Sequence, residues 1–315
     1  MLRVRFTAED LLGTRFAPEP APLMELGLAL ATLQGRDVLF DRWRRQARAG
    51  LPRGSRPLFE LVPPSGAGPV FLDPISDGLE DGLDTVSSTP APFAGAELRR
   101  VVAHRRPTPW VRALEDRDRD AWVVLDAALR AAYRAVLAET WPRVRACYRA
   151  EVAMHARSWA RDGVRAVLTA VHPGTGWDGS TLNIPVESRS GVDVGGTGVT
   201  LMPSVMWRGR PLFCRHPDGS LLIVYAAATP LPLAGGSLAD DSLSALLGST
   251  RAALLALTAA GRTTSELASA AGISIASASE HAKVLRAAGL ISSLRDGRAV
   301  LHTLAPLGEQ LLLAG

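Results

Sequence analysis

Residues 263–304 constrain the fold more tightly than any other part of the chain. Thr263 and Glu266 have the spacing of a capping box, in which each side chain binds an open backbone N–H at the start of a helix. Gly272 is suited to the left-handed residue that ends a helix, and Ser274 is a favourable N-cap for the next one. Two helices joined by so short a glycine-containing turn predict a helix-turn-helix.

The second predicted helix spans residues 274–288 and separates its side chains onto two faces. Its inward face is small or apolar and consists of Ala278, Ala282, Leu285 and Gly289. The outward face is small and polar in its N-terminal half, which is the half that enters the major groove in helix-turn-helix proteins. We therefore expect this helix to be the one that reads DNA.

A β-hairpin is predicted directly after this helix, over residues 290–304. Asp296-Gly297 lies between two apolar runs, and an Asp-Gly pair in this position is a strong signal for a two-residue turn. That turn would put Arg295 and Arg298 opposite each other at the tip, where two guanidiniums suit phosphates or the minor groove. The hairpin completes the pattern of a winged helix-turn-helix.

These elements and the residues that fill them resemble the arsenic-repressor (ArsR) type of bacterial transcriptional regulator. The similarity covers about 75 residues in which helix, turn, recognition helix and wing follow in order at the right spacings. The runs that carry it are 246–251, 263–268, 274–281, 284–290 and the Asp-Gly-Arg at 296–298. The resemblance implies a homodimer, repressor or activator, whose two recognition helices read a palindromic operator. A weaker similarity connects residues 203–226 with the N-terminal extension of some regulators of this type in high-GC bacteria.

We expect double-stranded DNA to be contacted by the two helix starts, the outward face of the second helix and the wing. The residues in these places are Thr264, Ser274, Ala276, Ser277, Ser279, Glu280, His281, Lys283, Arg295 and Arg298. Lys283 would bind phosphate, whereas Glu280 would repel phosphate and accept a hydrogen bond from a cytosine amino group. The alternative is a winged helix that binds protein instead of DNA.

We expect no metal and no cofactor at this motif. By the resemblance, founding members of the family bind metals through cysteines on the first helix of the motif, where this chain has only serines and alanines. Other members use histidine and acidic ligands on the last helix, where this chain offers His302 and Glu309 without enough partners. No metal site of the family carries over.

Charge is distributed unevenly along the 315 residues, although the net charge is only +4. Residues 240–315 carry 6 basic and 6 acidic groups, so the DNA-binding region is neutral overall. Residues 99–165 carry 15 basic and 8 acidic groups. Positive charge that neutralises phosphates supplies most non-specific affinity for DNA, and this Arg-rich segment is where the chain carries such charge. Two interpretations remain open: an accessory surface for DNA or a partner, and an ordinary solvated surface.

The composition also bears on the compartment. Cys147 and Cys214 are too few for a disulfide framework in a chain of this size, which favours a reducing cytoplasm. The N-terminus lacks the apolar core of a signal peptide, and prolines and glycines interrupt the uncharged stretch 219–239. We therefore expect a cytoplasmic protein without a membrane span.

The remaining sequence predicts a mixed α/β domain, so the fold class is α+β with a winged helix-turn-helix at the C-terminus. Strands are expected at residues 2–6, 182–186, 199–202, 211–213 and 221–225. Helices are expected at about 22–33, 37–49, 116–142 and 144–167. Pro142 is expected to end or kink the third of these helices. Residues 52–93 are expected to form an irregular connection with short pieces of structure. The predicted domains are residues 1–236 and 237–315.

Few residues of the N-terminal domain suggest chemistry. Cys147, Glu151 and His155 recur every four residues, so neighbouring pairs could share a metal, but the three span too great a length for one ion without further ligands. We interpret them as a partly buried cysteine, an ion-paired glutamate and a surface histidine. The glycines at 195–198 predict a loop, because a strand follows where a nucleotide site needs a helix. With no catalytic motif, we expect a protein that is not an enzyme.

We therefore predict a DNA-binding transcriptional regulator whose N-terminal domain responds to a small organic effector or a partner. The seven tryptophans, all upstream of the motif, are interpreted as core, with an apolar ligand pocket as the alternative. A second hypothesis is a regulator governed only by protein–protein contacts, with the N-terminal domain as an assembly scaffold. A third is an enzyme fused to a DNA-binding domain, which a buried cluster of perturbed titratable groups would favour.

Overall fold

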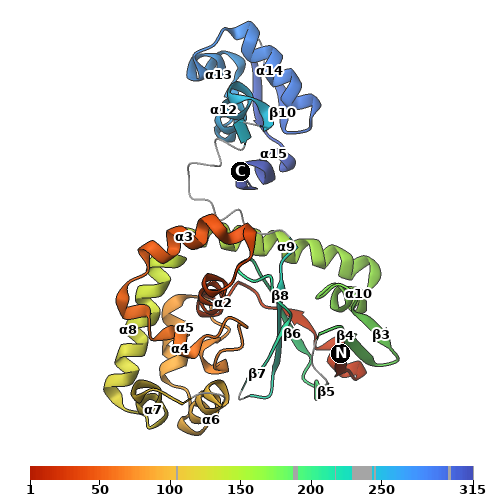
Figure 1. The fold of residues 1–315 in the computed structure, drawn as a ribbon. Helices are drawn as coiled ribbons and strands as arrows, with labels where there is room; N and C mark the ends of the chain where they lie inside the picture. Colours follow the sequence, from red (N-terminus) through yellow and green to blue (C-terminus); the bar gives the residue numbers. More distant parts are fainter. Residues whose placement is uncertain are drawn as a thin grey trace. The chain divides into compact units, whose positions relative to one another are not determined.

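A computed structural model of the chain describes residues 1–103, 106–186, 191–216, 218–228, 243–244, 246–296 and 299–314 (Figure 1). The contacts between residues divide the chain into two compact units, Met1–Leu231 and Pro232–Gly315. The predicted domain boundary after residue 236 lies outside the described residues. The fold class is confirmed, since the structure is a mixed α+β fold with a helix-turn-helix in its C-terminal unit.

The N-terminal unit contains two small sheets. The first has the strand order β3-β4-β1-β5 and is formed by β1 (Leu2–Arg5), β3 (Gly176–Asp178), β4 (Thr181–Ile184) and β5 (Gly191–Asp193). The second has the order β2-β6-β8-β7 and is formed by β2 (Arg15–Phe16), β6 (Val199–Ser204), β7 (Leu212–Arg215) and β8 (Leu221–Ala226). In the second sheet β6 is parallel to both β2 and β8, so the carboxyl ends of these three strands lie at one edge.

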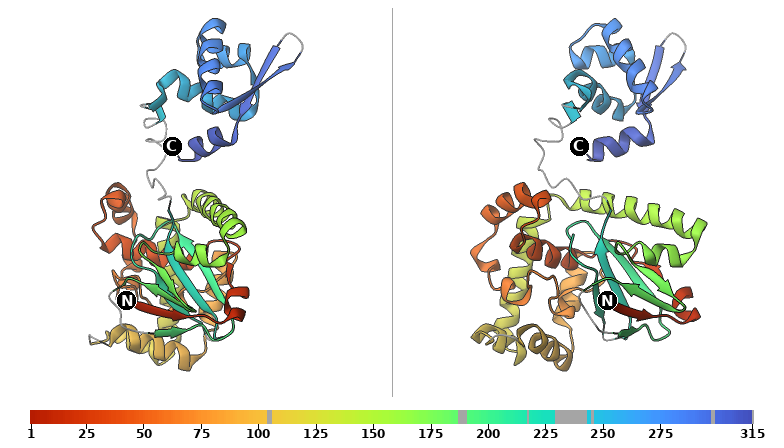
Figure 2. Two further views of the ribbon diagram at one scale, coloured as in Figure 1. Left: turned by 90° about the vertical axis from the view of Figure 1, so that its right-hand side faces the viewer. Right: turned by 45° about the vertical axis from the view of Figure 1, so that its right-hand side comes forward.

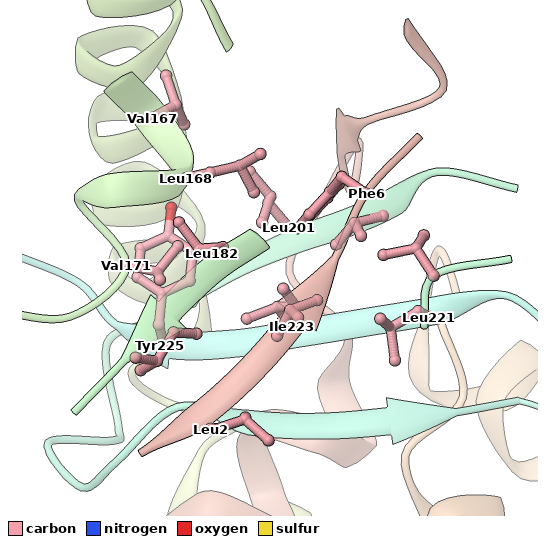
Figure 3. Close-up of a cluster of buried hydrophobic side chains, with 14 residues drawn as sticks. Leu2, Phe6, Val167, Leu168, Val171, Leu182, Leu201, Leu221, Ile223 and Tyr225 are labelled. Carbon is pink, nitrogen blue, oxygen red and sulfur yellow. The ribbon is translucent and has the colours of Figure 1, made fainter. Parts of the chain in front are cut away.

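One apolar core joins the two sheets. Figure 3 shows Leu2 and Phe6 from the chain's first residues packed with Leu201, Ile223 and other side chains of both sheets. The strand β1 alternates between buried and exposed residues, as a strand with one covered face should, whereas β6 is buried throughout. The expected strands are therefore confirmed, but their pairings connect segments far apart in the sequence: Leu2 pairs with Ile184.

Helices make up most of the rest of this unit. They are α1 (Ala8–Leu12), α2 (Pro22–Gln34), η1 (Val38–Phe40), α3 (Asp41–Gly50), η2 (Arg53–Ser55), α4 (Leu58–Leu61), η3 (Val70–Leu72), α5 (Leu79–Ser87), α6 (Ala91–Val102), α7 (Pro109–Glu115), α8 (Arg119–Val136), α9 (Trp141–Asp162) and α10 (Val164–Thr169).

The region 52–93 contains short pieces of structure between irregular stretches, as expected. They include α5 and the start of α6, whose apolar residues pack inward although Pro and Gly are frequent around them. One expectation about these helices was wrong. Pro142 neither ends nor kinks a helix; it stands in the first turn of α9, where its missing N–H has no helical partner to lose.

The C-terminal unit is a winged helix-turn-helix. Its elements are α12 (Ser249–Leu257), η4 (Thr258–Ala260), β9 (Arg262–Thr263), α13 (Thr264–Ala271), α14 (Ile275–Ala287), β10 (Ile291–Asp296), β11 (Ala299–Leu304) and α15 (Pro306–Ala314). The strands form a three-stranded sheet of order β10-β11-β9. The two views of Figure 2 show the β10–β11 hairpin extending beyond the helices of this unit. None of the helices in the described parts of the chain is long and apolar enough to cross a membrane.

Candidate nucleic-acid interface

The turn between α13 and α14 is built as its sequence predicts. Thr263 donates its backbone N–H to Glu266 Oε2 at 2.8 Å. The hydrogen bonds from the backbone and the side chain of Thr263 hold the pKa of Glu266 below its usual value. At the other end of α13, Gly272 has a φ of 65°, and Ile273 donates its N–H to the Ala268 carbonyl at 3.0 Å. Ser274 then caps α14 by accepting the Ser277 N–H at 3.1 Å.

The inward face of α14 anchors this helix in the core of the unit. Ala278, Ala282 and Leu285 are buried, and Leu285 packs in a cluster that includes Leu254 and Leu267. Gly289, which we expected on this face, is exposed instead. Its φ of 72° makes it the left-handed residue after the helix, and the next N–H, of Leu290, returns to the Leu285 carbonyl.

The outward face of α14 is available to a partner. The exposed residues of this face that we predicted as DNA contacts are Ala276, Ser279, Glu280 and Lys283, with Ser277 and His281 half-buried at its edges. Arg286 is also exposed, one turn after Lys283, and was not among the predicted contacts. A basic residue three positions after Lys283 on the same helix was the signal that could have identified it.

Thr264 has a different setting from the other predicted contacts. Its hydroxyl lies 2.9 Å from Nε2 of His302, while the hydroxyl of Ser293 lies 2.8 Å from Nδ1 of the same ring. His302 is buried, and burial together with the nearby Arg286 lowers its pKa. A neutral imidazole has one donor and one acceptor nitrogen, so this ring ties the start of α13 to both strands of the wing.

The wing pairs in a register that differs from the expected one. Asp296 pairs with Ala299 and Arg295 with Val300, so Arg295 does not face position 298 across the hairpin. The bond between Ser293 and His302 and the pairing of Ile291 with Leu304 belong to this register, whereas the expected register would place Ser293 opposite Val300. Arg295 is exposed. Arg298 lies outside the described residues.

In the group Cys147, Glu151 and His155, the glutamate and the histidine contact other parts of the N-terminal unit. His155 is buried and not a surface residue, because α9 lays it against Phe16, with ring centroids 5.8 Å apart. Its Nε2 lies 3.2 Å from Glu151 Oε1, which also accepts the Ala228 N–H at 2.9 Å. Within the described ranges, no group of three or more His, Cys, Asp or Glu residues could hold a metal ion.

Further buried ionisable groups lie at the carboxyl ends of the parallel strands. The Tyr148 hydroxyl donates to the carbonyl of Ala17, directly after β2, at 2.6 Å. Ser204, the last residue of β6, donates its hydroxyl to Glu25 Oε2 at 2.9 Å. Burial raises the pKa of Glu25 to about 7. These groups bind backbone atoms or a serine at the strand ends. Buried ionisable groups with shifted pKa values are also the feature that the hypothesis of a fused enzyme expects in this unit.

The geometry of the C-terminal unit defines a helix-turn-helix domain with a recognition helix exposed on one side, the class of domain that binds double-stranded DNA. A comparison with known families agrees: a family model described as a helix-turn-helix domain matches residues 246–293. The match covers α12, α13, α14 and the beginning of the wing, and it does not extend into the N-terminal unit. Comparisons with curated proteins and with solved structures gave no match.

Proposed function

We propose that the protein is a transcriptional regulator of the ArsR type that binds a palindromic operator as a homodimer. The recognition helix, residues 274–288, would enter the major groove, and the wing, residues 290–304, would contact the flanking backbone or minor groove. The observation that carries the proposal is the outward face of α14, where Ser279, Glu280 and Lys283 are exposed. Such a regulator acts in the cytoplasm.

We also propose that the N-terminal unit controls this DNA binding in response to a small organic effector. Two arrangements of the dimer that differ in the spacing of their recognition helices would bind the operator differently, and a ligand that prefers one of them would shift the population. The proposed control requires a ligand site in the N-terminal unit, which contains grooves of several hundred Å³.

The test is fluorescence anisotropy of the full-length protein on the DNA upstream of its own gene, measured over a salt series. Lys283→Ala should weaken binding to all sequences and reduce the salt slope by about two units, because the homodimer loses one phosphate contact in each half-site. Arg295→Ala should act in the same direction. Glu280→Ala should alter base preference, because a carboxylate that accepts from cytosine selects one base pair.

Arg45→Ala is the matched control, since it removes one exposed positive charge per subunit from α3 in the N-terminal unit, outside the Arg-rich segment 99–165. It should leave both affinity and salt slope unchanged. Selective binding that none of the α14 or wing variants disturbs would contradict the assigned contacts. An absence of selective binding would contradict DNA reading itself and favour a winged helix that binds protein.

A further inference from the structure

A groove between α5 and α8 in the N-terminal unit has the size and lining of a small-molecule site. Its volume is about 550 Å³, which lies within the range of pockets that bind organic ligands. Most of its lining is apolar, and consists of Leu83 and Val86 from α5 and of Trp122, Val123, Leu125 and Leu129 from α8. The leucines and Val86 are buried and form the floor, whereas Val123 is 60% exposed at the rim.

One end of this groove is cationic. Residues 116–120 alternate between Asp and Arg, and of these five the two arginines, Arg117 and Arg119, line the groove. Asp118 is used differently: it caps α8 by accepting the Ala121 N–H at 2.9 Å. Arg117 and Arg119 therefore line the groove, and the three aspartates of this segment do not.

Arg117 is positioned by the surrounding fold before any ligand arrives. Its φ of 61° lies in the left-handed region, which residues other than glycine rarely adopt. Its guanidinium carbon lies 4.0 Å from the centroid of a Trp122 ring, and the side chain donates a hydrogen bond to the Thr89 carbonyl. Backbone strain of this kind is concentrated at ligand-binding and active sites.

The other end of the groove carries one net negative charge. Arg130 on α8 binds Glu80 of α5 at 2.6 Å and Asp126 of its own helix at 2.8 Å, so one guanidinium is shared by two carboxylates. Of these three residues, Asp126 lines the groove. A ligand in the groove would therefore meet an apolar floor, an excess negative charge at one end and the positive charges of Arg117 and Arg119 at the other.

We propose that this groove binds a small amphiphilic anion, with an aromatic or alicyclic body on the apolar floor and a carboxylate or sulfonate at Arg117 and Arg119. The inference rests on the proposed ligand control of the regulator, for which it names the site and the class of ligand. A guanidinium binds such oxyanions through two parallel N–H groups, so the charge would orient the ligand along the groove.

The probe is anilinonaphthalene sulfonate, an aromatic anion whose fluorescence rises in apolar surroundings, titrated into the full-length protein. Its neutral analogue phenylnaphthylamine, which lacks the sulfonate, is titrated in parallel. Arg119→Gln should weaken binding of the sulfonate about three- to fivefold, the effect of one partly exposed ion pair, and leave the neutral analogue unaffected. Arg134→Gln, an exposed arginine of α8 that does not line the groove, is the charge-matched control and should change neither.

A second pair of variants locates the site. Ser87→Glu puts a carboxylate beside the cationic end, whereas Ala67→Glu puts the same charge into a different groove of about 580 Å³ lined by Trp207 and Phe213. The proposal expects the sulfonate to lose affinity about fivefold or more in Ser87→Glu and to keep it in Ala67→Glu.

Four results would overturn the proposal: no binding of the sulfonate, equal binding by the Arg119 and Arg134 variants, greater loss in the Ala67 variant, or equal sensitivity of the neutral analogue. Tryptophan fluorescence of each variant checks that the N-terminal unit is folded. The titration contains no DNA, so a failure here is distinguishable from a failure of DNA reading, which the anisotropy experiment reports separately.

Discussion

The two units of the chain use ionisable groups in opposite ways. The N-terminal unit buries Glu25, Glu151 and His155 between its helices and the ends of its parallel strands. In the described part of the C-terminal unit, the buried ionisable residue is His302, while the charged residues of α14 lie on the surface. This placement suits a helix-turn-helix unit, because charges on the surface are accessible to the phosphates and bases of DNA.

The difference also reflects how each unit satisfies its backbone. In both units helix ends are capped by neighbours in sequence, as the capping boxes Thr263–Glu266 and Thr7–Asp10 show. In the N-terminal unit, strand ends are in addition held by side chains from distant helices: Tyr148 of α9 binds the carbonyl of Ala17, and Glu151 binds the N–H of Ala228. Local caps make a segment readable from its sequence, whereas distant partners do not.

The largest expected effect comes from emptying the small core of the C-terminal unit. Leu267 is fully buried there, so Leu267→Ala should cost about 2–5 kcal/mol of the free energy of unfolding and abolish DNA binding. All seven tryptophans lie at or before residue 207, so tryptophan fluorescence during urea unfolding reports on the N-terminal unit and should not change. Ser269→Ala, an exposed site on α13, is the control. A similar shift in the tryptophan signal would show that the units unfold together.

The raised pKa of Glu25 predicts that the stability of the N-terminal unit depends on pH. Its pKa in the folded state is about 7, above its ordinary value of 4.5, so the folded state holds the proton more tightly. The stability that this proton contributes is complete below pH 4.5 and is lost as the pH rises through 7, by up to about 3 kcal/mol. Glu25→Gln, which resembles the protonated form, should remove this loss.

The measurement for Glu25 is urea unfolding followed by tryptophan fluorescence at several pH values from 4.5 to 8. The variant should match the wild type at pH 4.5 and exceed it at pH 8, because only the wild type must bury a charge there. Equal slopes with pH in the two proteins would show that Glu25 does not titrate in this range.

A smaller effect tests the helix cap at the turn. Ser274→Ala removes the hydroxyl that accepts the Ser277 N–H and should cost about 1 kcal/mol in the C-terminal unit. Ser279→Ala, an exposed residue within the same helix, should lie within about 0.5 kcal/mol of the wild type. Far-ultraviolet circular dichroism records the unfolding of both units, and tryptophan fluorescence, which reports on the N-terminal unit, identifies the transition of the C-terminal unit by difference. The cap would have no special role if the two variants were equally stable.

The smallest expected effect is a pH dependence of opposite sign in the C-terminal unit. The pKa of His302 is lowered from 6.5 by burial and by Arg286, so the folded state prefers the neutral ring. The stability that this preference contributes is present above pH 6.5 and is lost as the pH falls through the lowered pKa. His302→Gln should be less stable at pH 7.5 and show less pH dependence in the circular dichroism signal. If the stability of the wild-type C-terminal unit did not change between pH 7.5 and pH 5, the prediction for His302 would be wrong.

Much of the C-terminal unit could be predicted from the sequence because its signals are local. The expected recognition helix at 274–288 is α14, Ile275–Ala287, and its caps and inward residues Ala278, Ala282 and Leu285 are confirmed. The register of the wing was not predicted, because it involves the contact of Ser293 with His302 across the hairpin as well as the turn residues. The bond from Thr264 to His302 was missed for the same reason.

In the N-terminal unit the sequence indicated strands but not their partners. Period-two alternation marks residues 2–6 as a strand, yet nothing in it shows that β1 lies between β4 and β5. His155 was expected at the surface, because a polar residue on a long, Arg-rich helix is usually exposed. It is buried because α9 turns it toward Phe16 and Tyr225.

By itself, then, the sequence determined the elements that depend on neighbours within a few residues: the capping box at Thr263, the left-handed turn at Gly272 and the inward face of α14. The tertiary structure alone decided the register of the wing, the burial of Glu25 and His155, and the groove lined by Arg117 and Arg119. The physical reason is range. Caps and helix faces are set by bonds three or four residues apart, whereas burial and register depend on which distant segments meet.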